Sequence, residues 1–412
     1  MIAYDDARDF VLSLVTPLAP LSYELVDALG CVAAERVLAR EAVPGFANSS
    51  MDGFALRSVD SEAAPVRLRV VGTTLAGSAP AAVLAPGEAQ RIMTGAPMPP
   101  GADCVCMIEE VTVDDDGLFV EISRIVAAGE NVRLPGEDVM FGDELLRVGE
   151  VLRPPRLGVL ASQGLSSVLV HPRPRVGVVS TGNELTDAAS ALGPGQIRDT
   201  NRPLLKAMLR ESGFEAVDLG VAIDDEAATK TLLAAGASSC DAVISTGGVS
   251  VGDVDHVKSA ILQLAGERAR WMQVAIKPGK PFAFGVSAEG TPLFGLPGNP
   301  VSTRVSFELF VRPALRRLAG HDELDRVHFR AVLDAAIPRK DDGKLHVLHA
   351  QVALGVDQRL HVVRVVREGS HLLRGIADAN ALVLLPERAP LEEGCEVDVV
   401  VLDVEQLRAH AT

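Results

Sequence analysis

The segment 277–280 reads Lys-Pro-Gly-Lys, and the segment 298–300 reads Gly-Asn-Pro ahead of a stretch with helical character. Prolines restrict the backbone next to Lys277 and Lys280, so both cations are held in a defined turn. The first amides of a helix have no acceptor within the helix, and together with the helix dipole they stabilise an anion. Fixed lysines beside a helix start therefore predict a site for an oxyanion or a phosphate.

The elements that must position these turns alternate between strand and helix from residue 174 to residue 322. The apolar run at 176–180 is typical of a parallel strand that is buried on both faces. Further strands are predicted at 216–221, 242–245, 271–276, 281–285 and 292–296, and helices at 202–212, 225–235, 254–264 and 301–318. This alternation predicts a central, doubly wound α/β domain of three layers.

Ligands of such a sheet bind at the carboxyl ends of its strands, so the residues that follow the predicted strands are candidate site residues. They are Thr181, Glu184, Asp224, Gly247, Gly248, Ser250 and the Lys277–Lys280 turn. Glycines and hydroxyls in the loop 245–250 allow backbone N–H groups to approach a phosphate. The loop is not a P-loop, because G-x-x-x-x-G-K-[ST] is absent, and no G-x-G-x-x-G follows the first strand.

Three carboxylates, Glu184, Asp224 and Asp255, are expected at the same edge of the sheet. One interpretation is that they cap helices and interact with helix dipoles. The other is a Mg²⁺ site next to phosphates, since Mg²⁺ favours carboxylates together with phosphate oxygens. The residues alone leave both interpretations open.

The segments on either side of this domain have a different pattern of predicted secondary structure. Short alternating runs at 44–140 predict a β-rich inserted domain. It interrupts a discontinuous, helical N-terminal domain predicted from 1–43 plus 141–173, in which residues 32–37 have a helix-like pattern. Short strands at 323–412 predict a small C-terminal β-barrel, although a sandwich fits the same pattern. The chain is thus expected to be a multidomain protein of α/β and β parts.

The composition narrows the class of function. The 412 residues carry a formal net charge of -16, which argues against nucleic-acid partners and an anionic membrane surface. No apolar run reaches the roughly 18 residues that a membrane helix needs. Five scattered cysteines without metal-ligand spacing, and an acidic N-terminus without a leader, predict a cytoplasmic protein with reduced thiols. An anionic substrate would then need local lysines, arginines or a divalent metal.

An ordered set of motifs over nearly the whole chain resembles the molybdopterin molybdenumtransferase family, the MoeA type that also forms the E domain of gephyrin. The motifs are NSSMDGFA at 48–55, RIMTGA at 91–96, GED at 136–138, STGNEL at 180–185, DTN at 199–201, TGGVSVGD at 246–253, IKPGKP at 276–281 and LPGNPVS at 296–302. The resemblance implies four domains, a homodimer and the last step of molybdenum cofactor synthesis. In that step molybdate and adenylylated molybdopterin react, the metal enters the dithiolene, and AMP is released with Mg²⁺.

The resemblance also implies roles for individual residues. The family residues that bind the nucleotide and Mg²⁺ are matched by Glu184, Asp224, Ser250 and Asp255, with Glu184, Asp224 and Asp255 as metal ligands. Those that bind molybdate and the pterin phosphate are matched by Lys277, Lys280, Ser302 and Ser370. Asp52, Thr94 and Asp138 match residues that face the cleft from the partner subunit. Catalytic roles are implied for Asp52, Thr94, Asp138, Glu184, Asp255 and Lys277, and binding roles for Thr181, Gly247, Gly248, Ser250, Lys280, Pro300, Ser302 and Ser370.

Two positions depart from the family pattern. Gln273 stands where relatives often carry a basic residue, and His349 ends a run that relatives often end with arginine. A histidine would be a weaker, pH-sensitive substitute for an arginine that holds molybdate, and Arg364 or Arg367 could compensate.

Two alternatives come from other classes. A molybdopterin adenylyltransferase has a single α/β domain that resembles the one predicted here, but its loop reads Thr-Gly-Gly-Thr-Gly instead of the Thr-Gly-Gly-Val-Ser found at 246–250. A noncatalytic, gephyrin-like scaffold is disfavoured by the retention of Glu184, Asp224, Asp255 and both lysines. The resemblance further implies transient contacts with molybdopterin adenylyltransferase and with molybdoenzyme apoproteins or chaperones.

Overall fold

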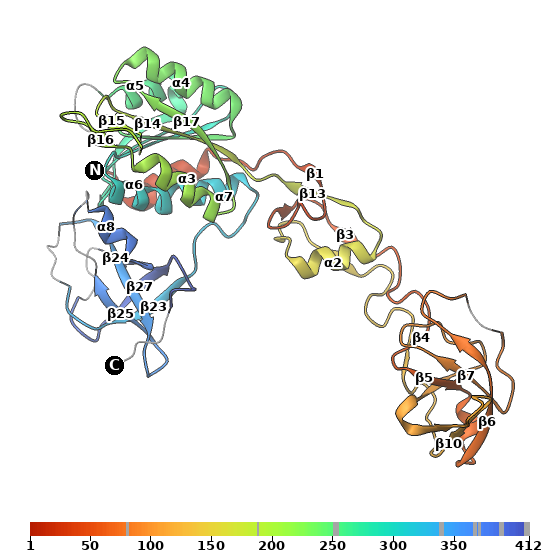
Figure 1. Cartoon of the computed structure of the whole chain (residues 1–412). Coiled ribbons are helices and arrows are strands. Elements are labelled where there is room, and N and C mark those ends of the chain that lie inside the picture. The colour runs from red at the N-terminus through yellow and green to blue at the C-terminus, as the bar shows by residue number, and fades with distance from the viewer. Residues whose placement is uncertain are drawn as a thin grey trace. The chain divides into compact units, whose positions relative to one another are not determined.

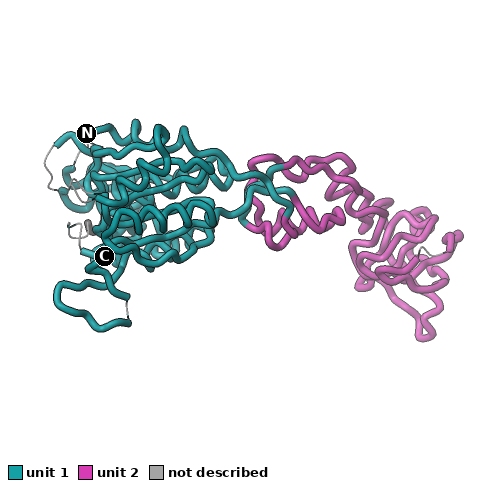
Figure 2. The backbone as a smooth tube through the Cα atoms, turned by 90° about the horizontal axis from the view of Figure 1, so that it is seen from above, with its two compact units in different colours: residues 1–22, 30–34, 169–412 teal, residues 23–29, 35–168 magenta. Residues whose placement is uncertain are grey.

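The computed structural model, drawn in Figure 1, describes residues 1–79, 82–187, 189–249, 255–337, 342–365, 369, 372–386 and 391–407. The chain forms two compact units, which Figure 2 colours separately. Unit 1 contains Met1–Ser22, Gly30–Ala34 and Leu169–Thr412, and unit 2 contains Tyr23–Leu29 and Glu35–Val168. No helix in the described part of the chain combines the length and apolar character needed to cross a bilayer.

The centre of unit 1 is a six-stranded sheet with the order β17-β14-β18-β22-β21-β19. Its strands are β14 (Arg175–Thr181), β17 (Glu215–Ala222), β18 (Ala242–Thr246), β19 (Ala269–Gln273), β21 (Pro281–Val286) and β22 (Pro292–Leu296). The first four in spatial order run parallel, and β21 and β19 continue the sheet in antiparallel pairing. The carboxyl ends of β14, β17, β18 and β22 therefore lie at one edge, as the sequence predicts.

Helices cover both faces of this sheet, which confirms the predicted three layers. Helices α4 (Glu226–Ser239) and α5 (His256–Ala265) pack on one face (Figure 1). The other face is covered by α1 (Tyr4–Ser13), α3 (Asn201–Glu211), and a continuous helix that runs through α6 (Pro300–Ser306), a π-helical segment (Phe307–Val311) and α7 (Arg312–Leu318). A short 3₁₀ turn, Gly266–Arg268, follows α5.

The chain leaves this sheet just before the Lys-Pro-Gly-Lys turn. Instead of one strand over 271–276, the structure has β19 and then β20 (Ile276–Lys277), which pairs with the C-terminal domain. In that domain five strands form a ring that the β24–β26 pairing closes. They are β23 (His328–Leu333), β24 (Leu345–Leu354), β25 (Leu360–Val365), β26 (Ala381–Leu385) and β27 (Glu396–Val401). The short helix α8 (Leu373–Ala377) precedes β26. The closed ring confirms the predicted β-barrel.

Unit 2 contains a six-stranded sheet of order β8-β5-β7-β6-β10-β9. The strands are β5 (Gly53–Leu56), β6 (Val66–Thr74), β7 (Glu88–Ile92), β8 (Cys104–Met107), β9 (Val111–Val113) and β10 (Phe119–Ile122), with 3₁₀ turns at Ser58–Ser61 and Ile108–Glu110. Smaller pairs join β4 (Asn48–Ser49) to β11 (Val132–Arg133) and β3 (Val37–Leu38) to β12 (Glu144–Leu146), and α2 spans Pro154–Ser162. Cys104 and Cys106 are buried in its core.

One local prediction is wrong. Residues 32–37 have a helix-like pattern, but the structure has the strands β2 (Val32–Ala33) and β3 there. β2 pairs with β13 (Ser167–His171), and the third short strand of this region is β1 (Leu21–Glu24). The pattern is too short to decide between helix and strand, and pairing with distant segments decides it.

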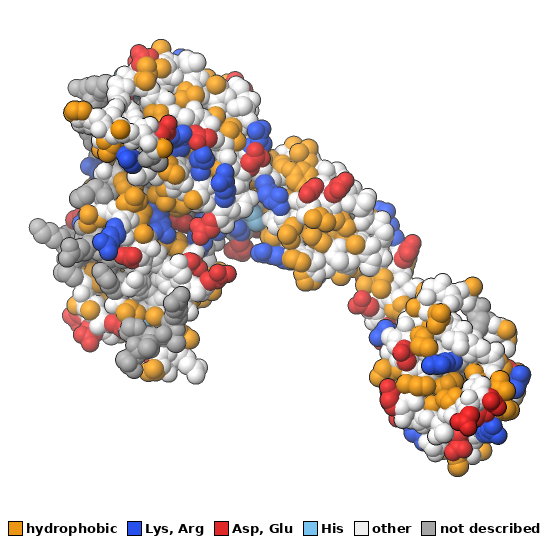
Figure 3. Space-filling model, viewed as in Figure 1, with side chains coloured by type: hydrophobic (Ala, Val, Ile, Leu, Met, Phe, Trp, Pro, Cys, Tyr) orange, Lys and Arg blue, Asp and Glu red, His pale blue; other side chains and the backbone are white. Residues whose placement is uncertain are grey.

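The surface charges are mixed. On the face drawn in Figure 3, Lys and Arg side chains are interspersed with Asp and Glu. Many of the cations belong to ion pairs, such as Arg330 with Asp398 and Arg175 with Glu215.

The barrel offers a pH-dependent stability test at His361. Its Nδ1 lies 2.6 Å from Asp334 Oδ1 and its Nε2 lies 3.1 Å from Asp357 Oδ1. The hydrogen bond with Asp334, and then that with Asp357, raises the pKa of His361. A raised pKa means that protonated His361 stabilises the fold below the unfolded-state pKa, and that this stability is lost as pH rises through the folded-state pKa.

We therefore expect the melting temperature of the native chain to fall more than that of His361→Gln between about pH 5.5 and about pH 8.5. Other titrating groups are common to both proteins, so the difference between their two pH profiles reports on His361. Parallel profiles in scanning calorimetry would contradict the assignment.

Candidate functional site

A cavity of about 920 Å³ lies at the carboxyl ends of the parallel strands of unit 1. Its wall is formed by the loops after β14, β17 and β18, the start of α5, the segment that leads into α3, and the turn between β22 and α6. The predicted site residues on this wall are Thr181, Glu184, Asp224, Gly247, Gly248, Asp255, Pro300 and Ser302. Residues far apart in sequence thus meet at one edge of the sheet, as the rule for open α/β sheets requires.

The loop after β18 needs its glycines. Gly247 and Gly248 have φ values of +90° and +61°, which side chains of L-residues rarely adopt. A Cβ on Gly247 would lie 2.6 Å from Thr181 Oγ1 and 2.9 Å from the Thr181 carbonyl oxygen. Thr181 Oγ1 in turn donates to the Thr246 carbonyl at 3.1 Å. The loop therefore presents backbone to the cavity, as a phosphate-binding loop must.

The three carboxylates border this same cavity, each from a different loop. Asp224 is not the cap of α4, because Asp225 Oδ1 accepts from Ala228 N–H at 2.8 Å and so fills that role. Asp224 exchanges two hydrogen bonds with Asn183: its Oδ2 accepts from Asn183 N–H at 3.0 Å, and its N–H donates to Asn183 Oδ1 at 3.1 Å. The Glu184 carboxylate folds back against Gly182, where a Cβ would overlap it. Their common cavity favours a shared role over separate capping.

These carboxylates do not form a complete metal site by themselves. Among the described residues, no three His, Cys, Asp or Glu side chains are close enough to hold an ion. A cation bound here would need further oxygen ligands. Phosphate oxygens and water supply such ligands in Mg²⁺ sites with only one or two carboxylates.

A smaller cavity, of about 480 Å³, contains the two lysines. Lys277 and Lys280 border it together with His346 and His349 of β24. Lys277 is the register partner of His346 in the β20–β24 pairing, which explains why the lysine turn faces the barrel. Pro281, Asn299 and Ser302 border both cavities. The two cavities therefore adjoin across a shared wall.

His349 is not the cationic substitute that the sequence suggests. Its side chain is 6% exposed, and burial, followed by the nearby charge of Arg304, lowers its pKa to about 3. The imidazole is therefore neutral at ordinary pH, so the expected pH-sensitive cation is wrong. Two arginines were expected to compensate for the missing molybdate-binding arginine. Of these, Arg367 lies outside the described residues, and the side chain of Arg364 is not described. Ser250 and Ser370 also lie outside the described residues.

Three predicted site residues belong to unit 2. Asp52 Oδ1 accepts hydrogen bonds from Thr94 N–H at 2.7 Å and from Thr94 Oγ1 at 2.8 Å. These bonds, the backbone one first, lower the pKa of Asp52, so it is a carboxylate at neutral pH. Asp138 is exposed on the turn that precedes Val139. Whether these residues face the cavities of another subunit stays a prediction.

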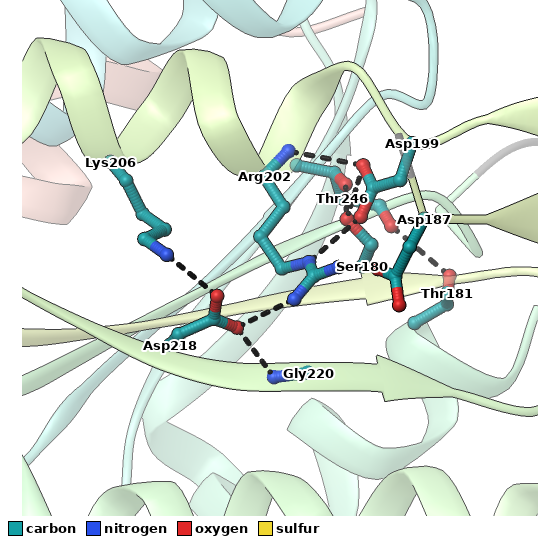
Figure 4. A network of polar contacts seen from close by, with 9 residues as sticks. All are labelled: Ser180, Thr181, Asp187, Asp199, Arg202, Lys206, Asp218, Gly220 and Thr246. Atoms are coloured by element: carbon teal, nitrogen blue, oxygen red, sulfur yellow. Dashed lines mark hydrogen bonds and ion pairs between the residues drawn. The ribbon is translucent and has the colours of Figure 1, made fainter. Parts of the chain in front are cut away.

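Sequence reasoning assigned no role to the polar network drawn in Figure 4. Its centre is Arg202, the second residue of α3, and Asp199, which borders the larger cavity and is 5% exposed. Asn201 connects the same segment to the shared wall, since its Nδ2 donates to the Gly298 carbonyl at 2.6 Å. The DTN motif was the available signal, but it does not show which partners these side chains have.

Known proteins match nearly the whole chain. Residues 2–164 match the MoeA N-terminal region (domain I and II), residues 177–317 a probable molybdopterin binding domain, and residues 330–402 the MoeA C-terminal region (domain IV). The molybdopterin molybdenumtransferase of Haemophilus influenzae is 37% identical over 97% of this chain and 98% of its own. Molybdopterin molybdenumtransferase 2 of Mycobacterium tuberculosis is 38% identical over 94% of this chain and 96% of its own.

A solved structure agrees as well. The crystal structure of a molybdopterin biosynthesis MoeA protein from Pyrococcus horikosii has a TM-score of 0.81 and 31% sequence identity, and the match covers 98% of this chain and 99% of that one. A second structure, of the molybdopterin biosynthesis MoeA protein from Pyrococcus horikoshii OT3, has a TM-score of 0.78 at 28% identity, covering 97% of this chain and 100% of that one.

The geometry of the glycine loop gives a direct test. Gly247→Ala combines a left-handed backbone with a clash against Thr181, and we expect it to lower the free energy of unfolding by about 3 kcal/mol or more. Gly213→Ala is the matched control, because its φ is +83° but nothing lies within 4 Å of the added Cβ. It should lose only about 1 kcal/mol.

The readout is urea unfolding followed by the fluorescence of Trp271, the one tryptophan of the chain, which lies in β19 of the α/β domain. Equal shifts of the unfolding midpoint in the two variants would contradict the close contact between Gly247 and Thr181.

Proposed function

This chain belongs to the molybdopterin molybdenumtransferase family, and we propose that it transfers molybdenum from molybdate to adenylylated molybdopterin and releases AMP with the help of Mg²⁺. Transfer of molybdenum to molybdopterin is the activity that the curated relatives are named for. The observation that carries the finer proposal is the shared wall of Pro281, Asn299 and Ser302 between the two cavities. Two anionic reactants could bind in adjoining cavities and meet across that wall.

The larger cavity fits the nucleotide and pyrophosphate part of the substrate. Its glycine loop offers backbone N–H groups, and Thr181 lies next to it. Glu184, Asp224 and Asp255 would hold Mg²⁺ together with phosphate oxygens, a donor set of hard oxygens that suits this ion. When bound, Mg²⁺ would neutralise phosphate charge and polarise the bond that breaks.

The smaller cavity fits molybdate. Lys277 and Lys280 offer two fixed cations to a dianion, and Ser302 adds a hydroxyl from the shared wall. The chain carries a net charge of -16, so these cations must offset a repulsive background at the site itself. Oriented cations in a partly closed cavity stabilise an anion more than the same groups do in open water.

We further propose a cytoplasmic homodimer of four-domain subunits, in which Asp52, Thr94 and Asp138 of one subunit face the cavities of the other. Molybdopterin adenylyltransferase and molybdoenzyme apoproteins or chaperones would be transient partners. A chain that sediments only as a monomer at assay concentrations would contradict the dimer.

One assay separates this function from its alternatives. The protein is incubated with adenylylated molybdopterin, Mg²⁺ and molybdate, and AMP release is followed. Release that depends on molybdate supports the proposal. Formation of the adenylate from molybdopterin and ATP would instead indicate an adenylyltransferase, and the absence of any turnover would indicate a scaffold.

We expect Lys277→Ala to lower turnover at limiting molybdate by about 100-fold, because one fixed cation is lost from the anion site. Lys230→Ala is the control: Lys230 lies on α4, donates to Gln263 and borders neither cavity. Circular dichroism should be unchanged in both variants. Native kinetics in Lys277→Ala would refute the role of this lysine.

We expect Asp255→Asn to raise the Mg²⁺ concentration that gives half-maximal AMP release by roughly tenfold, since the amide is a neutral and weaker ligand. The molybdate concentration for half-maximal turnover should stay near the native value, because Asp255 borders only the larger cavity. An unchanged Mg²⁺ dependence would count against Asp255 as a ligand.

A further inference from the structure

Arg202 binds three carboxylates that come from three different segments (Figure 4). Its Nε donates to Asp199 Oδ2 at 2.9 Å, one terminal nitrogen donates to Asp218 Oδ1 at 2.8 Å, and the other donates to Asp187 Oδ1 at 2.7 Å. Lys206, one turn further along α3, adds an outer ion pair to Asp218 at 2.6 Å. All three nitrogens of the guanidinium are thus used within the protein.

Asp199 is the buried member of this network. Its Oδ1 accepts from Ser180 Oγ at 3.0 Å and from the Arg202 backbone N–H at 3.1 Å. Ser180 Oγ also lies 3.4 Å from Thr246 Oγ1. The pair of Asp199 and Arg202 therefore ties the start of α3 to the ends of β14 and β18, where the glycine loop begins.

The network also fixes the segment that carries Glu184. This segment continues into a small ribbon of β15 (Leu185–Thr186) and β16 (Ile197–Arg198). Ile197 N–H donates to the Glu184 carbonyl at 2.8 Å, and Asp199 N–H donates to the Thr186 carbonyl at 2.9 Å. Asp187, at the end of the ribbon, is held by Arg202. The backbone around Glu184 is thus attached to Asp199 and Arg202 on its carboxyl side.

Burying such a pair is a poor way to gain stability. Desolvation of both charges offsets much of their attraction, and apolar replacements of similar volume are often neutral or stabilising. What the pair supplies is geometry, because a planar guanidinium can bind three carboxylates in fixed directions and a lysine cannot. Arg202 itself borders neither cavity, so it does not contact a ligand bound there.

We propose that Arg202 is a positioning residue for the metal and nucleotide half of the site: through Asp199 and Asp187 it holds the Glu184 segment against the larger cavity. The inference rests on the proposed function, since it assigns a task within that reaction. Loss of the network should therefore weaken the binding of Mg²⁺ and nucleotide in the larger cavity. The smaller cavity should keep its affinity for molybdate, because its lysine turn is held by the β20–β24 pairing.

The decisive variant is Arg202→Lys, which keeps the charge but cannot reproduce the three contacts. We expect the Mg²⁺ concentration for half-maximal AMP release to rise by roughly tenfold, the lower end of the range for groups that orient a metal ligand, because Arg202 acts on the Glu184 segment only through Asp199 and Asp187. The half-saturating molybdate concentration should change by less than about twofold. Calorimetric titration of AMP in the presence of Mg²⁺ should show weaker AMP binding to the variant than to the native protein, in a measurement that needs no turnover.

Two further variants serve as a control and as a milder test. Lys206→Met removes only the outer ion pair with Asp218, so its Mg²⁺ and molybdate midpoints should match those of the native protein. Asp187→Ala removes the contact to the ribbon at a side chain that is 72% exposed, so it should fold normally. It should raise the Mg²⁺ midpoint by about threefold, in keeping with one exposed ion pair. If Arg202→Lys does not fold, Asp187→Ala tests the positioning role in its place, and an unchanged Mg²⁺ midpoint in that variant overturns the role.

The outcomes separate the two claims. A native protein that releases no AMP in response to molybdate contradicts the proposed function. With native activity present, an unchanged Mg²⁺ midpoint and unchanged AMP binding in a folded Arg202→Lys overturn the positioning role. Equal weakening of molybdate and Mg²⁺ dependence also overturns it, because that pattern indicates a general loss of structure.

Discussion

The site depends on the hydrogen bonds that hold the turn 297–300 between the two cavities. Thr303 Oγ1 donates to the Pro297 carbonyl at 2.7 Å, and Asn201 Nδ2 donates to the Gly298 carbonyl at 2.6 Å. On the strand side, Gly247 N–H donates to the Leu296 carbonyl at 3.0 Å. The turn is thus fixed by α6, by α3 and by the glycine loop. All four residues of the turn border the larger cavity and Asn299 also borders the smaller one, so these hydrogen bonds fix part of the wall that the two cavities share.

Charge explains why such fixing is needed. A strongly acidic chain repels anions on average, and mobile surface lysines would provide little compensation against solvent and salt. Here the lysines lie in a proline-flanked turn, and the acidic residues of the larger cavity are suited to a divalent cation. Under the proposed function each cavity would have its own source of positive charge: lysine side chains in the smaller cavity and Mg²⁺ in the larger one.

The sequence predicts much of this arrangement, and the reasons are local. Apolar strands such as β14 and the glycine turns after them identify the sheet and its carboxyl edge, because few other folds produce both patterns in alternation with helices. Lys277 was expected at that edge, but it faces the barrel because β20 pairs with β24, a long-range contact that no local pattern encodes. The neutral state of His349 follows from burial in the assembled fold. The three partners of Arg202 likewise become visible only when strands and helix are brought together.

We propose that two anions bind in adjoining cavities of unit 1, and a crystal structure with molybdate, AMP and Mg²⁺ bound would show directly whether they do. We expect an anomalous molybdenum peak within hydrogen-bonding distance of Lys277 and Lys280. We also expect the AMP phosphate against the glycine loop of the same chain, beside Glu184. Molybdenum bound away from both lysines, or AMP and molybdate competing for a single cavity, would rule this arrangement out.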